Sequence, residues 1–260
     1  MNNCMRLRRM LIVSCLLISN LGSSFAQDKA AHGAVQVHVV ITAEAQREDS
    51  ELPALRQDDL KVKQGKTFLQ VTQLIPARGE AATLQLFILI DDTLGSGVGN
   101  NLTDIRQFIS AQPATTSIAI GYMSNATVNI VQNFTPDHAL AAKALRLPRG
   151  NLSTMDSPYL SLISLVKGWP QQNVRREVLM VTDGIDRLRG EKPSFSLGTS
   201  NAVSFKPYLE RLQKIFDSQY FLVFLATPGK KPGLQRVKIT TELANVEIAA
   251  PDNVWVSAGK

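Results

Sequence analysis

The chain has few cysteines and histidines and no long apolar run, and each scarcity excludes a class of protein. Its 260 residues include two cysteines and three histidines. No two histidines have the His-x-x-x-His spacing of a zinc site, and no Gly-x-Ser-x-Gly motif supplies the nucleophile of a Ser-His-Asp hydrolase. No segment has the roughly 18 consecutive apolar residues of a membrane-spanning helix. A zinc enzyme, a serine hydrolase and an integral membrane protein are therefore disfavoured.

The first 26 residues have the organisation of a secretory signal peptide. A basic start over Arg6–Arg9 precedes an apolar run over 10–21, and small residues occupy the −3 and −1 positions of a cleavage site after Ala26. Alternatively, Ile12–Cys15 resembles a lipobox that would make Cys15 a lipid anchor, but the apolar run before Cys15 is short for that role. We expect an exported protein, periplasmic or secreted, with a soluble mature chain.

Both cysteines, Cys4 and Cys15, lie in this leader. The mature chain is therefore expected to form no disulfide and to hold itself together by core packing. Removing the three leader arginines from 28 basic residues leaves 25 against 22 acidic ones, a balance of +3. Because the basic residues are scattered in sequence, we expect a solvated surface and no nucleic-acid partner.

Segments near both ends of the chain have the alternating or β-branched pattern of strands. They are 34–42, 58–66, 67–75, 235–241, 246–249 and 254–257. We expect residues 27–80 and 229–260 to meet and form one small β module.

Between residues 81 and 228, apolar strands alternate with helices. The predicted strands are 84–90, 116–123, 128–134, 177–182 and 220–226, and the predicted helices are 102–109, 136–145, 158–167 and 205–216. Nearly continuous apolar runs are typical of strands buried on both faces. This alternation predicts an α/β domain with a Rossmann-like, mostly parallel sheet and helices on both faces.

Two of these apolar strands end in acidic residues, Asp91 and Asp183. In open α/β sheets, ligands bind beyond the carboxyl ends of the strands. Neighbouring carboxylates repel one another and favour a hard cation such as Mg²⁺ or Ca²⁺. The hydroxyl groups that could complete its oxygen shell belong to Thr93, Ser96, Ser153, Thr154 and Ser157.

These residues carry a family resemblance. Phe87–Asp91 and Val178–Gly184 resemble the first and fourth strands of a von Willebrand factor A (VWA) domain. The resemblance implies a metal site with an Asp-x-Ser-x-Ser loop, a threonine from a second loop and an aspartate from a Thr-Asp-Gly turn. Asp91, Thr93 and Asp183 match this pattern, but Gly95 replaces the second serine.

Two positions of the implied metal site stay open. Ser96 is one residue out of register, and Thr154 and Ser157 are both candidates for the second-loop hydroxyl. The chain also resembles exported VWA-related proteins of Acidobacteria, through the β segments around the core and through Gln132–His138, Ser157–Tyr159 and Trp169–Pro170. That resemblance covers nearly all of the mature chain.

The strand-end acids allow more than one function. They can hold a metal at a protein-binding rim, or they can cap helix N-termini and accept hydrogen bonds from loop amides. We expect a binding or scaffold protein that grips another protein and is not an enzyme. The alternatives are a structural component of an envelope assembly with a vestigial metal site, and a carboxylate-dependent hydrolase.

Overall fold

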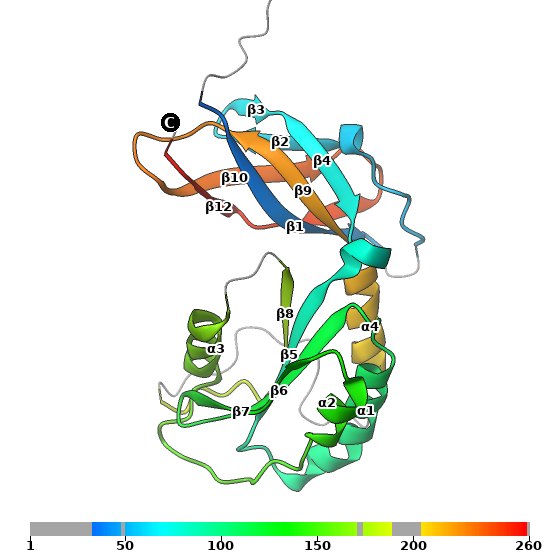
Figure 1. The fold of residues 1–260 in the computed structure, drawn as a ribbon, viewed down its shortest axis with the longest axis vertical. Coiled ribbons are helices and arrows are strands. Elements are labelled where there is room, and N and C mark those ends of the chain that lie inside the picture. Colours follow the sequence, from blue (N-terminus) through cyan, green and yellow to red (C-terminus); the bar gives the residue numbers. More distant parts are fainter. Residues whose placement is uncertain (1–32, 48–49, 171–173, 189–203, 259–260) are drawn as a thin grey trace, which may run out of the picture. The chain divides into compact units, whose positions relative to one another are not determined.

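The computed structural model describes residues 33–47, 50–170, 174–188 and 204–258. The predicted signal peptide, residues 1–26, lies outside them. The described part contains three four-stranded sheets and four α-helices (Figure 1). None of its helices has the length and apolarity needed to cross a membrane.

Two of the sheets form a β module built from both ends of the chain (Figure 1). One has the strand order β11-β1-β9-β4 and the other has the order β12-β10-β2-β3. The strands are β1 (Val35–Ala45), β2 (Leu60–Gln64), β3 (Thr67–Leu69), β4 (Val71–Pro76), β9 (Gln219–Ala226), β10 (Gly233–Thr241), β11 (Val246–Ala249) and β12 (Asn253–Val256). Every pairing within these two sheets is antiparallel.

The two chain ends meet in this module, as the sequence predicts. Thr42 of β1 lies opposite Ala249 of β11, and Val62 of β2 lies opposite Ile239 of β10. Alternate side chains of these strands face inward and form one apolar cluster, which includes Val62 and Phe224 of β9. The period-two pattern of the sequence therefore corresponds to one buried and one exposed face of the β12-β10-β2-β3 sheet.

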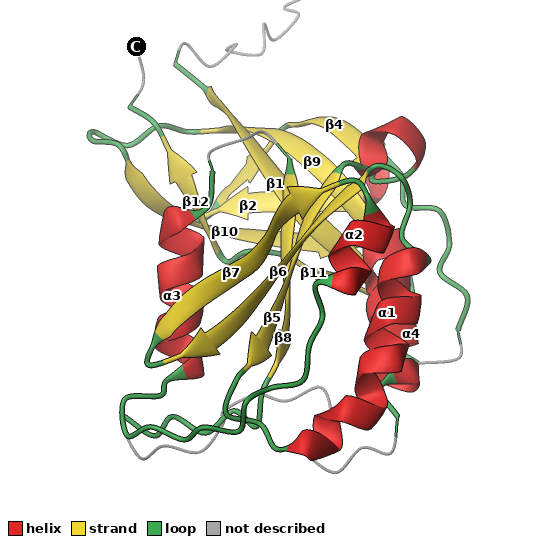
Figure 2. Ribbon diagram, turned by 60° about the horizontal axis from the view of Figure 1, so that its bottom comes forward, coloured by secondary structure: helices red, strands yellow, loops and turns green. Residues whose placement is uncertain are grey.

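The middle of the chain forms an α/β core around the third sheet (Figure 2). Its strand order is β7-β6-β5-β8, with β5 (Leu84–Asp91), β6 (Thr116–Ser124), β7 (Thr127–Thr135) and β8 (Arg175–Val181). Its helices are α1 (Leu102–Ser110), α2 (His138–Lys143), α3 (Pro158–Gly168) and α4 (Lys206–Asp217). β5 is parallel to both β6 and β8, whereas β7 is antiparallel to β6.

Strand β5 is buried along its whole length because helices cover both faces of the sheet. Ile88 packs in one cluster with Ile105 of α1, whereas Phe87 packs in another with Leu165 of α3. Fully burying side chains of this size stabilises a fold by about 1.5–3 kcal/mol each. The predicted placement of helices on both faces is confirmed.

The prediction of a mostly parallel sheet is confirmed only in part: in the core sheet, β5 is parallel to β6 and β8, and β7 is antiparallel to β6. Seven of the nine strand pairings in the described part are antiparallel. The segment 220–226, expected as a further strand of the parallel sheet, is β9, which pairs with β1 and β4 in the β module. A short apolar run predicts a buried strand without specifying its neighbour, so the sequence pattern fits either sheet.

Candidate binding site at the strand ends

The carboxyl ends of β5 and β8 lie side by side, and Asp91 joins them. Ile90 pairs with Val181, so the residues that follow the two strands are neighbours. Oδ1 of buried Asp91 accepts hydrogen bonds from the Thr93 amide (3.0 Å) and hydroxyl (2.7 Å), and Oδ2 accepts one from the Thr182 hydroxyl (2.8 Å). The two strands are neighbours, which is the condition under which the sequence places Asp91 near Asp183.

Asp183 follows β8 and is paired with an arginine. Its Oδ1 accepts a hydrogen bond from the Ile185 amide (2.9 Å), and its Oδ2 lies 2.7 Å from Nη2 of Arg187. Both side chains are largely buried, with 19% of Asp183 and 22% of Arg187 exposed. An ion pair in such a position is screened less by solvent than one on the surface.

A third carboxylate, Asp156, joins the loop before α3 to the same site. Its side chain is buried and accepts hydrogen bonds from the amides of Asn125 (2.7 Å) and Ser153 (2.6 Å). Its carbonyl oxygen accepts hydrogen bonds from the amides of Arg187 (2.9 Å) and Leu188 (3.1 Å). The loops after β6, before α3 and after β8 therefore converge on Asp156.

Arg187 is the cation shared by these carboxylates. Its hydrogen bond with Asp183 raises the pKa of the guanidinium, and the negative charges of Asp91 and Asp156 raise it further, against the opposing effect of burial. Opposite charges attract one another over a few ångströms, so the Arg187 guanidinium is stabilised by the negative potential of Asp91, Asp156 and Asp183.

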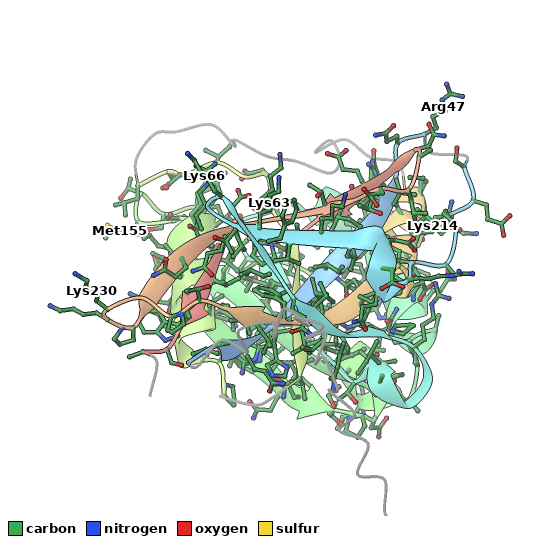
Figure 3. All side chains as sticks on the ribbon, turned by 90° about the horizontal axis from the view of Figure 1, so that it is seen from above. Arg47, Lys63, Lys66, Met155, Lys214 and Lys230 are labelled. Carbon is green, nitrogen blue, oxygen red and sulfur yellow. The ribbon has the colours of Figure 1, made fainter. Side chains whose placement is uncertain are left out.

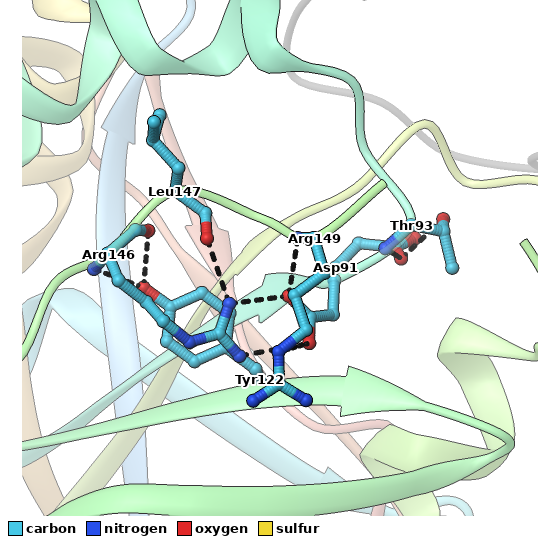
Figure 4. A network of polar contacts seen from close by, with 7 residues as sticks. Asp91, Thr93, Tyr122, Arg146, Leu147 and Arg149 are labelled. Carbon is cyan, nitrogen blue, oxygen red and sulfur yellow. Dashed lines mark hydrogen bonds and ion pairs between the residues drawn. The ribbon is translucent and has the colours of Figure 1, made fainter. Parts of the chain in front are cut away.

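Asp92, the residue after Asp91, forms a second paired site, and its partners Arg146 and Arg149 are labelled in Figure 4. Arg146 binds its two oxygens with Nη1 and Nη2, at 2.6 and 2.9 Å, and the Arg149 amide donates to Oδ1 at 2.9 Å. The guanidinium also lies over the ring of Tyr122, 3.7 Å from its centroid. Burial raises the pKa of Asp92, but these hydrogen bonds and the two arginine charges outweigh it, so the pKa lies below its ordinary value.

The structure brings together some of the predicted metal ligands. Asp91 and Thr93 contact one another, and Asp183 lies at the adjacent strand end. Ser157 is buried as the N-cap of α3, where its hydroxyl accepts a hydrogen bond from the Leu160 amide (3.3 Å). Of the two second-loop candidates, Ser157 is thus occupied as a helix cap.

Of the other two predicted ligands, Thr154 shows no hydrogen bond with Asp91 or Asp183 among the described residues. Thr154 is exposed in a turn between α2 and α3. Ser96 begins the 3-10 helix η3 (Ser96–Asn101), and its side chain lies outside the described part of the structure. Asp91 and Asp183 each accept a hydrogen bond from the amide two residues later, as the non-metal interpretation predicts, but neither caps a helix in the described part.

The predicted metal site already faces a cation of the chain itself, Arg187. Among the residues that the structure describes, no group of three or more His, Cys, Asp or Glu side chains could hold a metal ion. Arg187 already presents a positive charge to Asp91, Asp156 and Asp183, and a second cation at that position would be repelled by it. The metal role of the predicted ligands stays a prediction.

Sequence reasoning missed the residues that compensate the acids. Arg187 follows Asp183 by four residues. This spacing predicts an ion pair only if the segment between them is known to form a turn. Thr182 lies within the Thr-Asp-Gly turn, but that motif does not predict its hydrogen bond to Asp91. Arg146 is 54 residues from Asp92, and no local pattern connects them.

Exposed apolar side chains lie on the loops that carry the paired carboxylates. We call this set the apolar rim, and it consists of Leu147 (53% exposed), Leu152 (67%), Met155 (53%), Ile185 (40%) and Leu188 (40%). The contacts of Asp156 and Asp92 hold the loops that carry these residues close together. Clustered exposed apolar residues with a polar centre are typical of protein-binding surfaces.

Comparisons with known proteins place the chain in no family. No family model matches it, and no curated protein matches it. It is similar to the N-terminal three-domain structure of the type V pili tip protein Mfa5 from Porphyromonas gingivalis, at 11% identity and a TM-score of 0.31, over 59% of this chain and 27% of that one. It is also similar to the ArnB paralog VWA2 from Sulfolobus acidocaldarius, at 8% identity and a TM-score of 0.33, over 85% of this chain and 76% of that one. The chain thus spans about a quarter of the length of the Mfa5 structure, and at these TM-scores neither likeness carries an argument about fold or function.

Proposed function

We propose that the chain is an exported protein-binding or scaffold protein that holds another protein at the apolar rim. The observation that carries this proposal is the combination of exposed apolar side chains with a centre of carboxylates that arginines already compensate. Arg146 and Arg187 already pair with Asp92 and Asp183, so a partner can cover these two carboxylates without leaving them unpaired.

We propose further that the α/β core is VWA-like. Strand β5 runs into Asp91, and β8 runs into Thr182 and Asp183 at the same edge of the sheet. Helices cover both faces of that sheet. This arrangement agrees with the sequence resemblance at Phe87–Asp91 and Val178–Gly184, whereas the placement of β9 in the β module departs from it.

We infer that Arg187 supplies the positive charge that a metal ion would otherwise supply. A Mg²⁺ or Ca²⁺ ion held by Asp91 and Asp183 would require this guanidinium to leave its hydrogen bond with Asp183. Gly95 has no side chain to act as a ligand where the VWA pattern has its second serine. Both features favour partner binding that does not depend on a divalent metal.

The rim has the chemistry to bind an apolar segment that carries an acidic residue. Each leucine or methionine that the partner covers would contribute up to about 1.5–3 kcal/mol of burial. Beside them, the Arg149 side chain is 65% exposed and lies 4.0 Å from Asp92, so it can also pair with an acid on the partner. Arginine and methionine are both enriched at protein interfaces relative to the rest of the surface.

Site-specific crosslinking tests the proposal. A photo-crosslinking residue at Met155 should capture a protein from the envelope fraction, and the same residue at Lys214 of α4 serves as a control. Capture should persist in chelator, and it should be lost when Leu152 and Ile185 are changed to serine. Equal capture from the rim and from Lys214, or undiminished capture by the serine variant, would contradict the proposal.

A structural role in an envelope assembly is the second candidate, and Gly95 and Arg187 favour it because both argue for a vestigial metal site. In that case the chain would enter a large assembly whose formation does not depend on the apolar rim. Fractionation of the envelope separates the two candidates, because the rim variant would then remain in the assembly. A hydrolase would be indicated only by turnover that Asp183→Asn abolishes.

A further inference from the structure

The outer face of the β12-β10-β2-β3 sheet is exposed and carries an excess of positive charge. Its inward-facing side chains, among them Val62 and Val256, are buried, so the alternate residues project to solvent. The cations on this face and in its adjoining turns are Lys61, Lys63, Lys66, Lys230, Lys231, Arg236 and Lys238. We call this set of residues the basic face, and Lys63, Lys66 and Lys230 are labelled in Figure 3.

Few acids offset these charges. Glu242 is hydrogen-bonded to Lys61, and Asp252 precedes β12. Lys63 and Lys238 lie directly opposite one another on β2 and β10. Like charges opposite one another destabilise a sheet, so this pair favours a bound anionic surface that would relieve the repulsion.

Two large apolar side chains project from the same sheet. Leu234 and Trp255 lie opposite one another on β10 and β12, with 69% and 63% of their surfaces exposed. They are more exposed than almost any other large apolar residue in the described part. Phe68 of β3 is also exposed, but Nζ of Lys63 lies over its ring at 4.3 Å from the centroid.

We propose that the basic face binds the surface of an anionic lipid bilayer. Lysine and arginine pair with anionic headgroups, and tryptophan and leucine enter the interfacial region just beneath them. Leu234 and the Trp255 indole suit the boundary between headgroups and acyl chains. They suit single-stranded nucleic acid less well, because successive bases stack on several aromatic side chains. This face and the apolar rim share no residue, so the proposal does not rest on the proposed function.

Cosedimentation with vesicles tests the proposal on the mature full chain. The protein should bind vesicles of phosphatidylglycerol and phosphatidylcholine, bind pure phosphatidylcholine much more weakly, and dissociate as salt is raised. Each lysine near an anionic surface contributes a factor of about five, so Lys63→Gln with Lys238→Gln should weaken binding about 25-fold. The matched control is Lys143→Gln with Lys167→Gln in the α/β core, and it should bind like the unaltered protein.

A second experiment tests the contribution of Leu234 and Trp255. Leu234→Ser with Trp255→Ser should also weaken binding, whereas Ile163→Ser with Val166→Ser, an exposed pair on α3, should not. Both serine variants must first show an unchanged circular dichroism spectrum and melting temperature, and a variant that fails this check is replaced by Leu234→Gln with Trp255→Gln. Equal binding to neutral and anionic vesicles, or no binding, would overturn the proposal. So would binding to a single-stranded oligonucleotide or an anionic polysaccharide that requires the same lysines while vesicles fail to bind.

Discussion

Replacing Arg146 with methionine should strongly destabilise the α/β core. Arg146 makes two hydrogen bonds to Asp92, whose side chain is only 9% exposed, and it stacks on Tyr122. Methionine keeps much of the apolar volume but removes the charge, so the Asp92 carboxylate loses its bidentate partner. The remaining partners are the Arg149 amide at 2.9 Å and the Arg149 guanidinium at 4.0 Å.

The magnitude follows from how deeply the pair is buried. Breaking a fully buried ion pair costs about 3–5 kcal/mol because it leaves an uncompensated charge. Because 31% of the Arg146 side chain is exposed and one amide bond to Asp92 remains, we expect a loss of about 2–4 kcal/mol. The double variant Arg146→Met with Asp92→Asn should lose less than Arg146→Met alone, since the stranded charge is gone.

Urea unfolding gives the free energies, and the fluorescence of buried Trp169 reports on the α/β core. The pKa of Asp92 lies below its ordinary value in the folded protein, so the pair contributes stability that is present above the unfolded pKa and is lost as pH falls through the folded one. In Arg146→Met, burial would raise that pKa instead. The deficit of the variant should therefore shrink as pH falls from about 7 towards about 4.

Two results would refute this reasoning. One is a loss below about 1 kcal/mol, which is the scale of an exposed ion pair. The other is a double variant whose loss equals the sum of the two single losses, because that would mean that Arg146 and Asp92 are not coupled.

Three further substitutions test local packing and capping, each by its urea midpoint. Gly121→Val should cost about 1–3 kcal/mol, because even a Cβ there would lie 2.8 Å from the Phe87 ring, and an unchanged midpoint would contradict the packing. Trp169→Phe should cost about 1–3 kcal/mol through loss of its 2.7 Å hydrogen bond to buried Gln85, with little change in apolar burial. Ser157→Ala should cost about 1 kcal/mol because α3 loses its N-cap, and a restored midpoint in Ser157→Asp would confirm the capping role.

Local patterns in the sequence predicted most of the individual elements. The apolar run at 84–90 became β5, and the helical spacing of Leu102, Ile105 and Phe108 became the buried side of α1. Such patterns suffice because burial on one or both faces of an element fixes which residues must be apolar. The sequence placed Asp91 near Asp183 only on the condition that their strands are neighbours, and the pairing of β5 with β8 meets that condition.

The partner of each strand was harder to predict. The β9 segment has the same apolar pattern whether it lies beside β8 or between β1 and β4. Its antiparallel pairing, with Leu222 opposite Val39, depends on contacts between residues nearly two hundred positions apart. No local signal records such contacts.

The charge balance of the site was missed for a similar reason. Carboxylates at strand ends predict a cation, but the sequence does not say whether that cation is a metal or a side chain. Arg187 reaches Asp183 because the loop after β8 is held by the carbonyl oxygen of Asp156. Arg146 reaches Asp92 because the segment after α2 passes the end of β5. Both contacts arise only when the loops are folded together.

A melting experiment tests most directly whether arginine takes the place of a metal at the strand ends. The melting temperature of the unaltered protein should not change when Mg²⁺, Ca²⁺ or a chelator is added. Arg187→Gln should melt lower and should gain stability from Mg²⁺ or Ca²⁺, because Asp91, Asp156 and Asp183 would then lack a cation and binding to the folded state raises its stability. The account would be contradicted if either ion stabilised the unaltered protein and Asp183→Asn abolished that stabilisation.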